Sequence, residues 1–524
     1  YRQYTYTKYR DARIVYAPPA SIGKYGGDID NWMWPRHTGD FTFYRVYESI
    51  DGQPAEYSQD NVPLMVNSYL KVAQNDLKVG DAAFIIGFPG ITTRYRTSWD
   101  IEHTIDYTYK PRINEYKDYL DIIEGIYKKD PDAKLLLSSR HAGINNYMKK
   151  YQGNIDGFQA IDFIGSHKAE EKAIKDFIGK DKKLKRRFSH VLDEMNNLIK
   201  EKESYNDYDQ MLDAFGYYSG LLYNFADYAY EMAKERDKPA PDRDPDFSEK
   251  RIREYIERLP YRFYSYHEGN DKAVLEYAIK KAKDLNKEYY IELPENTRKW
   301  VNDAYRKSKL NDPKFVEKLF SMSAARIEAL DDPLVQFAVS LYAPKLEQKQ
   351  RTRNWEARMN DVREQYMELL AIYRGTPQYP DATGTMRFTY GKVEGYTPKD
   401  AVYYKAFTTL SGVIAKNTGQ EPFDMPQYLS EIKSKDKWID PELNDVPSCF
   451  LLTTDITNGN SGSSIMNAKG ELIGLAFDGN YEAMTSDWVF QPSIQRTIAV
   501  DIRYVLFITS EFAGGNWILE EMGI

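Results

Sequence analysis

The chain has 524 residues, 42% of them hydrophobic and 29% charged, so we expect two or three globular domains and exclude a disordered chain. Its 71 basic and 79 acidic residues give a net charge of −8, which argues against nucleic acid as the main partner. The single cysteine, Cys449, excludes an intrachain disulfide and a cysteine-based zinc site, and no apolar run is long enough to span a membrane. We predict neither a metal nor a cofactor.

Tyrosine is unusually abundant, with 44 residues. Its ring is amphipathic and suits recognition surfaces and clefts, but it also packs ordinary helices. The excess therefore hints at a binding role without defining one.

The first part of the chain has the pattern of short strands and turns. Residues 13–17 and 40–47 are β-like runs between turns rich in proline and glycine, and residues 82–90 predict a buried strand that ends in a turn. The pattern then changes, because apolar residues recur at helical spacing, as in residues 184–199, with charged residues between them. Residues 239–246 predict a proline-broken loop between helices.

A β-like pattern returns near residue 377. Residues 386–396 predict a strand pair, and residues 498–508 predict a helix close to the end of the chain. We therefore predict an α+β protein in which residues 1–99 and 377–524 form one β architecture and residues 100–376 are an inserted helical domain.

The most informative motif is the heptapeptide Asn-Gly-Asn-Ser-Gly-Ser-Ser at residues 458–464. It lies between two hydrophobic runs, residues 449–454 and 471–477. Glycines allow a tight turn that presents Ser461 as a nucleophile, with the amides of Gly459 and Ser461 as an oxyanion hole. A polar hairpin turn explains the heptapeptide alone equally well.

A serine nucleophile needs a base and a carboxylate that orients the base. Asp40 suits the carboxylate, because it follows a glycine and opens an alternating strand. An Asx turn at the start of a strand is the simpler interpretation of its position, and Asp28 and Asp30 are competing carboxylates nearby.

The segment from residue 30 to residue 40, Asp-Asn-Trp-Met-Trp-Pro-Arg-His-Thr-Gly-Asp, suits a ligand-facing loop better than a core strand. Together with residues 145–149, 459–463 and 477–480 it resembles the bacterial dipeptidyl peptidases of the 7 and 11 type, with type 7 the closer. The resemblance covers essentially the whole chain. It implies a chymotrypsin-like double β-barrel, with only part of the first barrel in this chain, interrupted by an all-helical insertion.

The resemblance assigns roles to particular residues. Ser461 matches the nucleophile and Asp40 the aspartate of the catalytic triad. Residues that match the binding site for the substrate's N-terminal dipeptide are Asn31, Trp32, Asn146 and Asp478, of which Asn146 and Asp478 match the partners of the free amino group. From the residues alone, Asn146 is better explained as a polar residue on a helix surface.

Gly479 matches a residue that lines the S1 pocket in the family. A glycine there leaves volume and adds no charge, so we expect a bulky hydrophobic P1 side chain. Ser464 departs from the family, which commonly has proline at this position, and this affects the rigidity of the turn more than the chemistry.

The sequence contains no clear candidate for the general base of the catalytic triad. The six histidines include His37, three residues before Asp40, but His37 matches an ordinary position of the family motif. We expect the catalytic histidine to lie upstream of Tyr1, so that this chain holds most but not all of the enzyme.

The sequence thus predicts a serine dipeptidyl aminopeptidase that acts on peptides with a free N-terminus. The resemblance further implies a homodimer in the periplasm or at the cell surface of a Gram-negative bacterium. One alternative is a non-catalytic, aromatic-rich peptide- or glycan-binding protein. Another is a trypsin-like endopeptidase, against which Asp478 argues.

Overall fold

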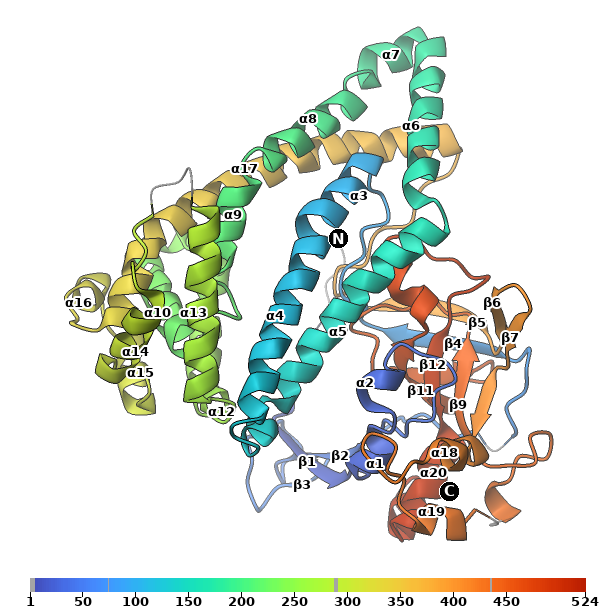
Figure 1. The fold of residues 1–524 in the computed structure, drawn as a ribbon. Helices are drawn as coiled ribbons and strands as arrows, with labels where there is room; N and C mark the ends of the chain where they lie inside the picture. Colours follow the sequence, from blue (N-terminus) through green and yellow to red (C-terminus); the bar gives the residue numbers. More distant parts are fainter. Residues whose placement is uncertain (1–4, 74, 287–290, 434–435) are drawn as a thin grey trace. The chain divides into compact units, whose positions relative to one another are not determined.

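The computed structural model describes residues 5–73, 75–286, 291–433 and 436–524. It is a mixed helix and sheet structure, which confirms the predicted α+β class (Figure 1). The chain forms two compact units, the first from residues 1–96, 153–161 and 379–524 and the second from residues 97–152 and 162–378.

The first unit is built on a seven-stranded sheet with the strand order β5-β4-β10-β11-β12-β9-β8. Its strands are β4 (Ala82–Gly87), β5 (Arg387–Lys392), β8 (Phe407–Thr409), β9 (Pro447–Leu452), β10 (Ser464–Asn467), β11 (Leu472–Gly479) and β12 (Thr497–Asp501). All its pairings are antiparallel, and β4 from the early segment pairs with β5 and β10 from the late one. The two ends of the chain therefore share one sheet.

Two small sheets complete the β structure of this unit. One consists of β1 (Asp11–Tyr16), β2 (Phe43–Glu48) and β3 (Val62–Pro63), and the other of β6 (Tyr396–Lys399) and β7 (Val402–Tyr404). Its short helical elements include α1 (Ala20–Gly23), α2 (Gly27–Asp30), α18 (Leu410–Lys416), α19 (Tyr428–Glu431), η5 (Tyr481–Asp487), α20 (Ile502–Phe507), η6 (Ile508–Phe512) and α21 (Asn516–Glu521).

Strand β9 lies at the centre of the core, since each of its six residues is buried. Cys449 lies in this strand, where burial raises the pKa of its thiol to about 12. The residue therefore stays a protonated, apolar core side chain, as its sequence context predicts.

The second unit is helical. Its helices are α3 (Ser98–Thr104), α4 (Lys110–Tyr127), α5 (Ala133–Ala160, which continues into the first unit), α6 (Phe163–Lys180), α7 (Lys182–Phe188), α8 (Val191–Glu203), α9 (Asn206–Asp213), α10 (Leu221–Arg236), α11 (Glu249–Glu257), α12 (Leu259–Phe263), α13 (Glu268–Leu285), α14 (Thr297–Lys307), α15 (Pro313–Phe320), α16 (Ala324–Glu328) and α17 (Pro333–Arg374). Short helical turns, η1 (Ile105–Tyr109), η2 (Ala240–Asp242) and η3 (Pro245–Phe247), link some of them.

Local sequence signals define the ends of the longest helix, α17. The Asp332 side chain accepts hydrogen bonds from the N–H groups of Leu334 and Val335, and Pro333 occupies the first turn. Gly375 ends the helix with a φ of 70°. Inside these limits α17 packs against α8 and α10, and the Trp355 indole donates to the Leu198 carbonyl at 2.7 Å.

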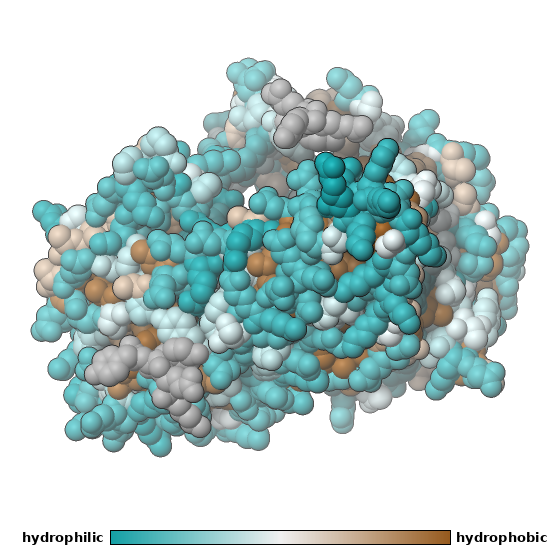
Figure 2. Space-filling model, turned by 90° about the horizontal axis from the view of Figure 1, so that it is seen from above, coloured by the Kyte–Doolittle hydropathy of each residue, from teal (hydrophilic) through white to brown (hydrophobic). Residues whose placement is uncertain are grey.

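Hydrophilic residues dominate the face of the molecule that Figure 2 shows, and apolar residues form small separate patches there. In the helices that the structure describes, we find none that is both long and apolar enough to cross a bilayer. The described side chains also include no group of three or more His, Cys, Asp and Glu residues arranged to hold a metal ion.

Candidate active site

Ser461 lies on the exposed turn between β9 and β10. Its hydroxyl donates to the carbonyl of Phe477 in β11 at 3.3 Å. The turn is fixed to the same strand by its backbone, because the N–H of Gly462 donates to the Ala476 carbonyl at 2.7 Å and the N–H of Ala476 donates to Ser463 at 3.0 Å. A rigid sheet therefore presents the Ser461 side chain at the surface.

Gly459 makes this turn possible. Its φ is +101°, and an added Cβ would lie 2.4 Å from the carbonyl oxygen of Phe88, so only glycine fits. Within the described residues, the N–H groups of Gly459 and Ser461 donate to no protein acceptor. Both donors of the predicted oxyanion hole are thus available for an anionic oxygen.

Asp478 stands near the end of β11, and its carboxylate is nearly buried. One oxygen, Oδ2, accepts hydrogen bonds from the Trp32 N–H at 3.1 Å and from Arg36 Nη1 at 2.8 Å. The other, Oδ1, accepts from the N–H of Gly479 at 2.9 Å. Since a carboxylate offers about four lone-pair positions, Oδ1 keeps capacity for one more donor, such as an ammonium group.

Arg36 is the functional-site residue that the sequence analysis missed. Its side chain is nearly buried, and its Nη1 also donates to the Asp30 carbonyl at 2.7 Å while Nε donates to the Thr38 hydroxyl at 2.9 Å. Burial raises the pKa of Asp478, and the Arg36 guanidinium opposes that rise. Arg36 therefore fixes both the position and the charge of Asp478.

Asp40 follows Gly39 in the loop before β2, with an exposed side chain that accepts no hydrogen bond in the described part of the chain. Desolvation by surrounding atoms and the negative charge of Asp478 raise the pKa of its carboxyl, while Arg36 opposes the rise. The competing Asp30 is buried and paired with Lys416 at 2.8 Å. Of these two carboxylates, only Asp40 remains open to a base, and its triad role stays a prediction.

Among the described residues, no histidine forms a hydrogen bond with Ser461 or with Asp40. Five of the six lie in the second unit, and the sixth, His37, is buried with its Nε2 against Gly412 of α18. Burial, with the nearby Lys416 ammonium, lowers the pKa of His37 to about 3, so this side chain is neutral at physiological pH.

The loop that holds Asn31 and Trp32 leaves some of its side chains half-buried and places others in the core. Trp32 has a φ of 64° and, like Asn31, is half-buried. Trp34 faces the core instead, is 5% exposed and donates from its indole to the Lys405 carbonyl at 3.1 Å. Asn146 lies half-buried on α5 in the second unit, and its role, like those of Asn31 and Trp32, stays a prediction.

The chain is similar in sequence to a family of known peptidases. Residues 1–524 match the family described as Peptidase S46. An Asp/Glu-specific dipeptidyl-peptidase of Shewanella putrefaciens is 34% identical over 563 residues, with 98% of this chain and 74% of that protein covered. A dipeptidyl-peptidase 7 of Phocaeicola vulgatus is also 34% identical, over 546 residues, with 98% of this chain and 72% of that protein covered.

The fold is similar to that of a solved structure as well. The crystal structure of Porphyromonas endodontalis DPP11 in complex with the dipeptide Arg-Glu has a TM-score of 0.79 and 29% identity. The match covers 98% of this chain and 75% of that one. This chain therefore spans about three quarters of the length of these relatives.

The predicted preference for a bulky hydrophobic P1 side chain is wrong. Relatives at the same identity include Asp/Glu-specific enzymes, and the matched structure is a DPP11. The structure shows why the glycine argument fails: a Cβ on Gly479 would lie 3.0 Å from the Ala483 Cβ and 3.3 Å from Cζ3 of Trp32. The space that a small residue was expected to leave at this position is already filled.

Proposed function

Since the chain belongs to the peptidase S46 family, we propose that it is a serine dipeptidyl peptidase that releases dipeptides from the N-terminus of peptides. The main support for the proposal is the exposed turn of Ser461. On one rigid segment it presents a candidate nucleophile and two N–H groups, those of Gly459 and Ser461, that donate to no acceptor in the described residues. A polar hairpin turn has no need of such donors. The non-catalytic binding protein is disfavoured, because the relatives named above are peptidases.

In this proposal Ser461 attacks the scissile carbonyl, and the N–H groups of Gly459 and Ser461 stabilise the negative oxygen of the tetrahedral intermediate. Asp40 orients the general base. Asp478 binds the substrate's ammonium through the free lone pair of Oδ1, and Asn31, Trp32 and Asn146 complete recognition of the dipeptide. A fixed ammonium partner limits the product to two residues, because a longer N-terminal extension has no room beyond it.

We also assign the first unit to the chymotrypsin-like architecture. Support comes from the nucleophile turn, which follows a fully buried strand and precedes an antiparallel pair, β10 and β11. We propose in addition that the β structure of this unit is divided into two barrels.

The test is product analysis with the full-length protein. Hexapeptides with a free N-terminus, whose second residue is varied among Asp, Glu, Leu and Phe, are incubated with the protein and followed by mass spectrometry. We expect the N-terminal dipeptide to be released from at least one peptide. Release stops in Ser461→Ala, while the Ser430→Ala control, on α19 away from the site, retains it.

Acetylated copies of the same peptides separate the proposal from an endopeptidase. Acetylation removes the ammonium that Asp478 is proposed to bind, so cleavage should fall by at least about 100-fold. Equal cleavage of free and acetylated peptides would identify an endopeptidase, and absence of any cleavage dependent on Ser461 would reject the proposal.

A further inference from the structure

Two adjoining cavities lie wholly within the helical second unit. Their volumes are about 530 and 990 Å³, and both are lined by Tyr116, Tyr151, Tyr217 and Tyr218. The rings contact one another: Tyr116 stacks on Tyr151 at 6.0 Å and meets Tyr218 edge-on at 5.8 Å between centroids. Part of the tyrosine excess of the sequence is thus gathered around these two cavities of the second unit.

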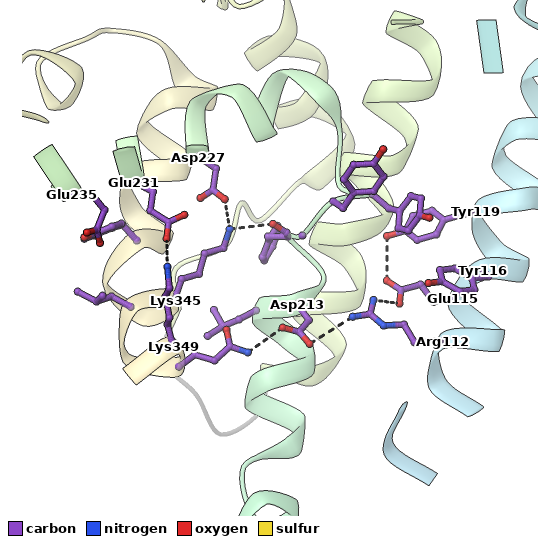
Figure 3. Close-up of a pocket in the computed structure, with 18 of the residues that line it drawn as sticks. Arg112, Glu115, Tyr116, Tyr119, Asp213, Asp227, Glu231, Glu235, Lys345 and Lys349 are labelled. Carbon is purple, nitrogen blue, oxygen red and sulfur yellow. Dashed lines mark hydrogen bonds and ion pairs between the residues drawn. The ribbon is translucent and has the colours of Figure 1, made fainter. Parts of the chain in front are cut away.

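In the smaller cavity each basic side chain of the wall is already paired with a carboxylate (Figure 3). Lys345 pairs with Asp227 at 2.8 Å and Lys349 pairs with Glu231 at 3.0 Å. On the opposite wall Arg112 pairs with Glu115 at 2.7 Å. The wall of the smaller cavity therefore offers no unpaired cation to an anionic ligand.

The larger cavity is different, because its two arginines rest on tyrosine rings rather than on carboxylates. The guanidinium of Arg262 lies 4.2 Å from the ring centroid of Tyr255, and that of Arg140 lies 5.6 Å from the centroid of Tyr218. In the described residues neither arginine side chain forms an ion pair or a hydrogen bond, and Nε of Arg262 is buried without an acceptor. The wall of this cavity therefore contains two arginines whose guanidiniums have no protein acceptor.

The two acidic side chains in the wall of the larger cavity, Asp227 and Asp271, are already engaged, and Asp227 pairs with Lys345. Asp271, also in the wall of this cavity, accepts hydrogen bonds from the N–H groups of Leu221 and Leu222 and from the Tyr305 hydroxyl. Arg140 acts on it only through its field, which opposes the rise that burial causes in the pKa of Asp271. Asp271 therefore does not neutralise the arginine by direct pairing.

A buried acceptor in the same wall completes the site. Asn270 is 2% exposed, and its Oδ1 has no hydrogen-bond donor in the described structure. A simple anion satisfies the guanidiniums but supplies no donor for this oxygen. A peptide supplies both, through side-chain carboxylates and backbone N–H groups.

We propose that the larger cavity, whose wall is formed by residues of the second unit alone, is a binding site for an acidic peptide segment. Carboxylates of the peptide pair with Arg140 and Arg262, a backbone N–H donates to Asn270, and the tyrosine rings cover the apolar parts of the peptide. The volume of about 990 Å³ is sufficient for a short segment of several residues.

The test uses a peptide that a dipeptidyl peptidase cannot cleave. A fluorescent, N-acetylated and C-amidated peptide with alternating Glu and Tyr is titrated with the full-length protein, and anisotropy reports binding. We expect saturable binding that weakens by about tenfold or more in Arg140→Gln and in Arg262→Gln. The matched control is Arg253→Gln, which makes the same charge change at an exposed position of α11 outside the cavity and should leave the affinity within about twofold.

The proposal is overturned by no binding to the wild-type protein, by equal binding of the peptide with Gln in place of Glu, or by unchanged affinity in both cavity variants. Stronger competition by a uronic-acid oligosaccharide than by unlabelled peptide would also reject a peptide ligand. If circular dichroism shows that a Gln variant fails to fold, Arg262→Lys is tested in its place. This variant keeps the positive charge but loses the planar guanidinium, so we expect the affinity to fall by about threefold or more. Because the peptide is blocked, these results are independent of the proposed peptidase activity.

Discussion

At the scale of single residues, the site depends on the buried contact between Arg36 and Asp478. The two side chains are each 9% exposed, and 442 residues separate them in the sequence. Sequence motifs predicted Asp478 but not Arg36, because no local pattern marks a partner so distant along the chain. A carboxylate in this position needs a cation and hydrogen-bond donors to stay ionised, and Arg36, Trp32 and Gly479 provide them.

Arg36→Met should therefore lower the free energy of unfolding of the first unit by about 3 kcal/mol, because it leaves Asp478 buried without a cation. Urea titration measures the loss. The control is Arg10→Met, which breaks an exposed pair with Glu56 and should cost less than about 1 kcal/mol. Equal losses in the two variants would show that the Arg36 pair does not stabilise the site.

His37 predicts a pH dependence of stability. Its folded pKa, about 3, lies below the ordinary histidine value of 6.5, so the unfolded chain binds a proton more readily between these values. Its contribution to stability is constant above pH 6.5 and is lost as the pH falls from 6.5 toward 3, by up to about 1.4 kcal/mol per unit. His37→Gln removes this loss, so the difference in free energy of unfolding between variant and wild type should shift in the variant's favour from pH 7 to pH 5. A difference that does not change with pH would contradict the neutral, buried His37.

At the scale of elements, the turn before β10 is the part of the site that the sequence predicted best. Its composition suggested a tight turn, and two of its glycines, Gly459 and Gly462, have positive φ values of 101° and 83°. The two glycines differ in their surroundings, since an added Cβ meets Phe88 at Gly459 and nothing within 4 Å at Gly462.

We accordingly expect Gly459→Ala to reduce kcat/KM by about 100-fold or more, because the turn and its proposed oxyanion donors must move. Gly462→Ala costs only backbone strain of about 1–2 kcal/mol and should retain most of the activity. Steady-state kinetics on a cleaved peptide compares them. Similar kcat/KM values for both variants would argue against a role of the Gly459 amide.

The C-terminal part of α5 depends on glycine for close packing. A Cβ at Gly157 would lie 2.5 Å from Cγ2 of Thr485 in η5, whose hydroxyl accepts a hydrogen bond from Gln495 at 3.0 Å. At Gly143, earlier in the same helix, an added Cβ meets nothing within 4 Å. Gly157→Ala should lower the melting temperature, by overpacking worth about 1–3 kcal/mol, and Gly143→Ala should raise it slightly through helix propensity. Calorimetry checks the opposite signs, and a Gly157→Ala protein as stable as the wild type would contradict this packing.

Two elements show where sequence patterns were insufficient. Residues 498–508 were predicted to be helical, but strand β12 runs to Asp501, whose side chain caps the helix α20 that follows. Almost every residue in this stretch is buried on all sides, so its apolar pattern has no period that distinguishes strand from helix. The predicted strand pair at residues 386–396 is also wrong, because β5 pairs with β4, about 300 residues earlier in the chain.

At the scale of the whole molecule, the sheet of the first unit unites segments on both sides of the helical block, with β4 between β5 and β10. The alternation of β-like and helical patterns along the chain made the mixed class predictable, since periodicity is a local signal. The strand order was not predictable, because pairing depends on tertiary contacts between distant segments. Family membership then connects the sheet and its nucleophile turn to peptidase chemistry.

The central claim is that Ser461 is an activated nucleophile. Treatment of the full-length protein with a fluorophosphonate, followed by digestion and mass spectrometry, tests it most directly. We expect covalent modification at Ser461, abolished in Ser461→Ala and strongly reduced in Asp40→Asn. Absence of labelling at Ser461 in the full-length protein would contradict an activated serine nucleophile at this position.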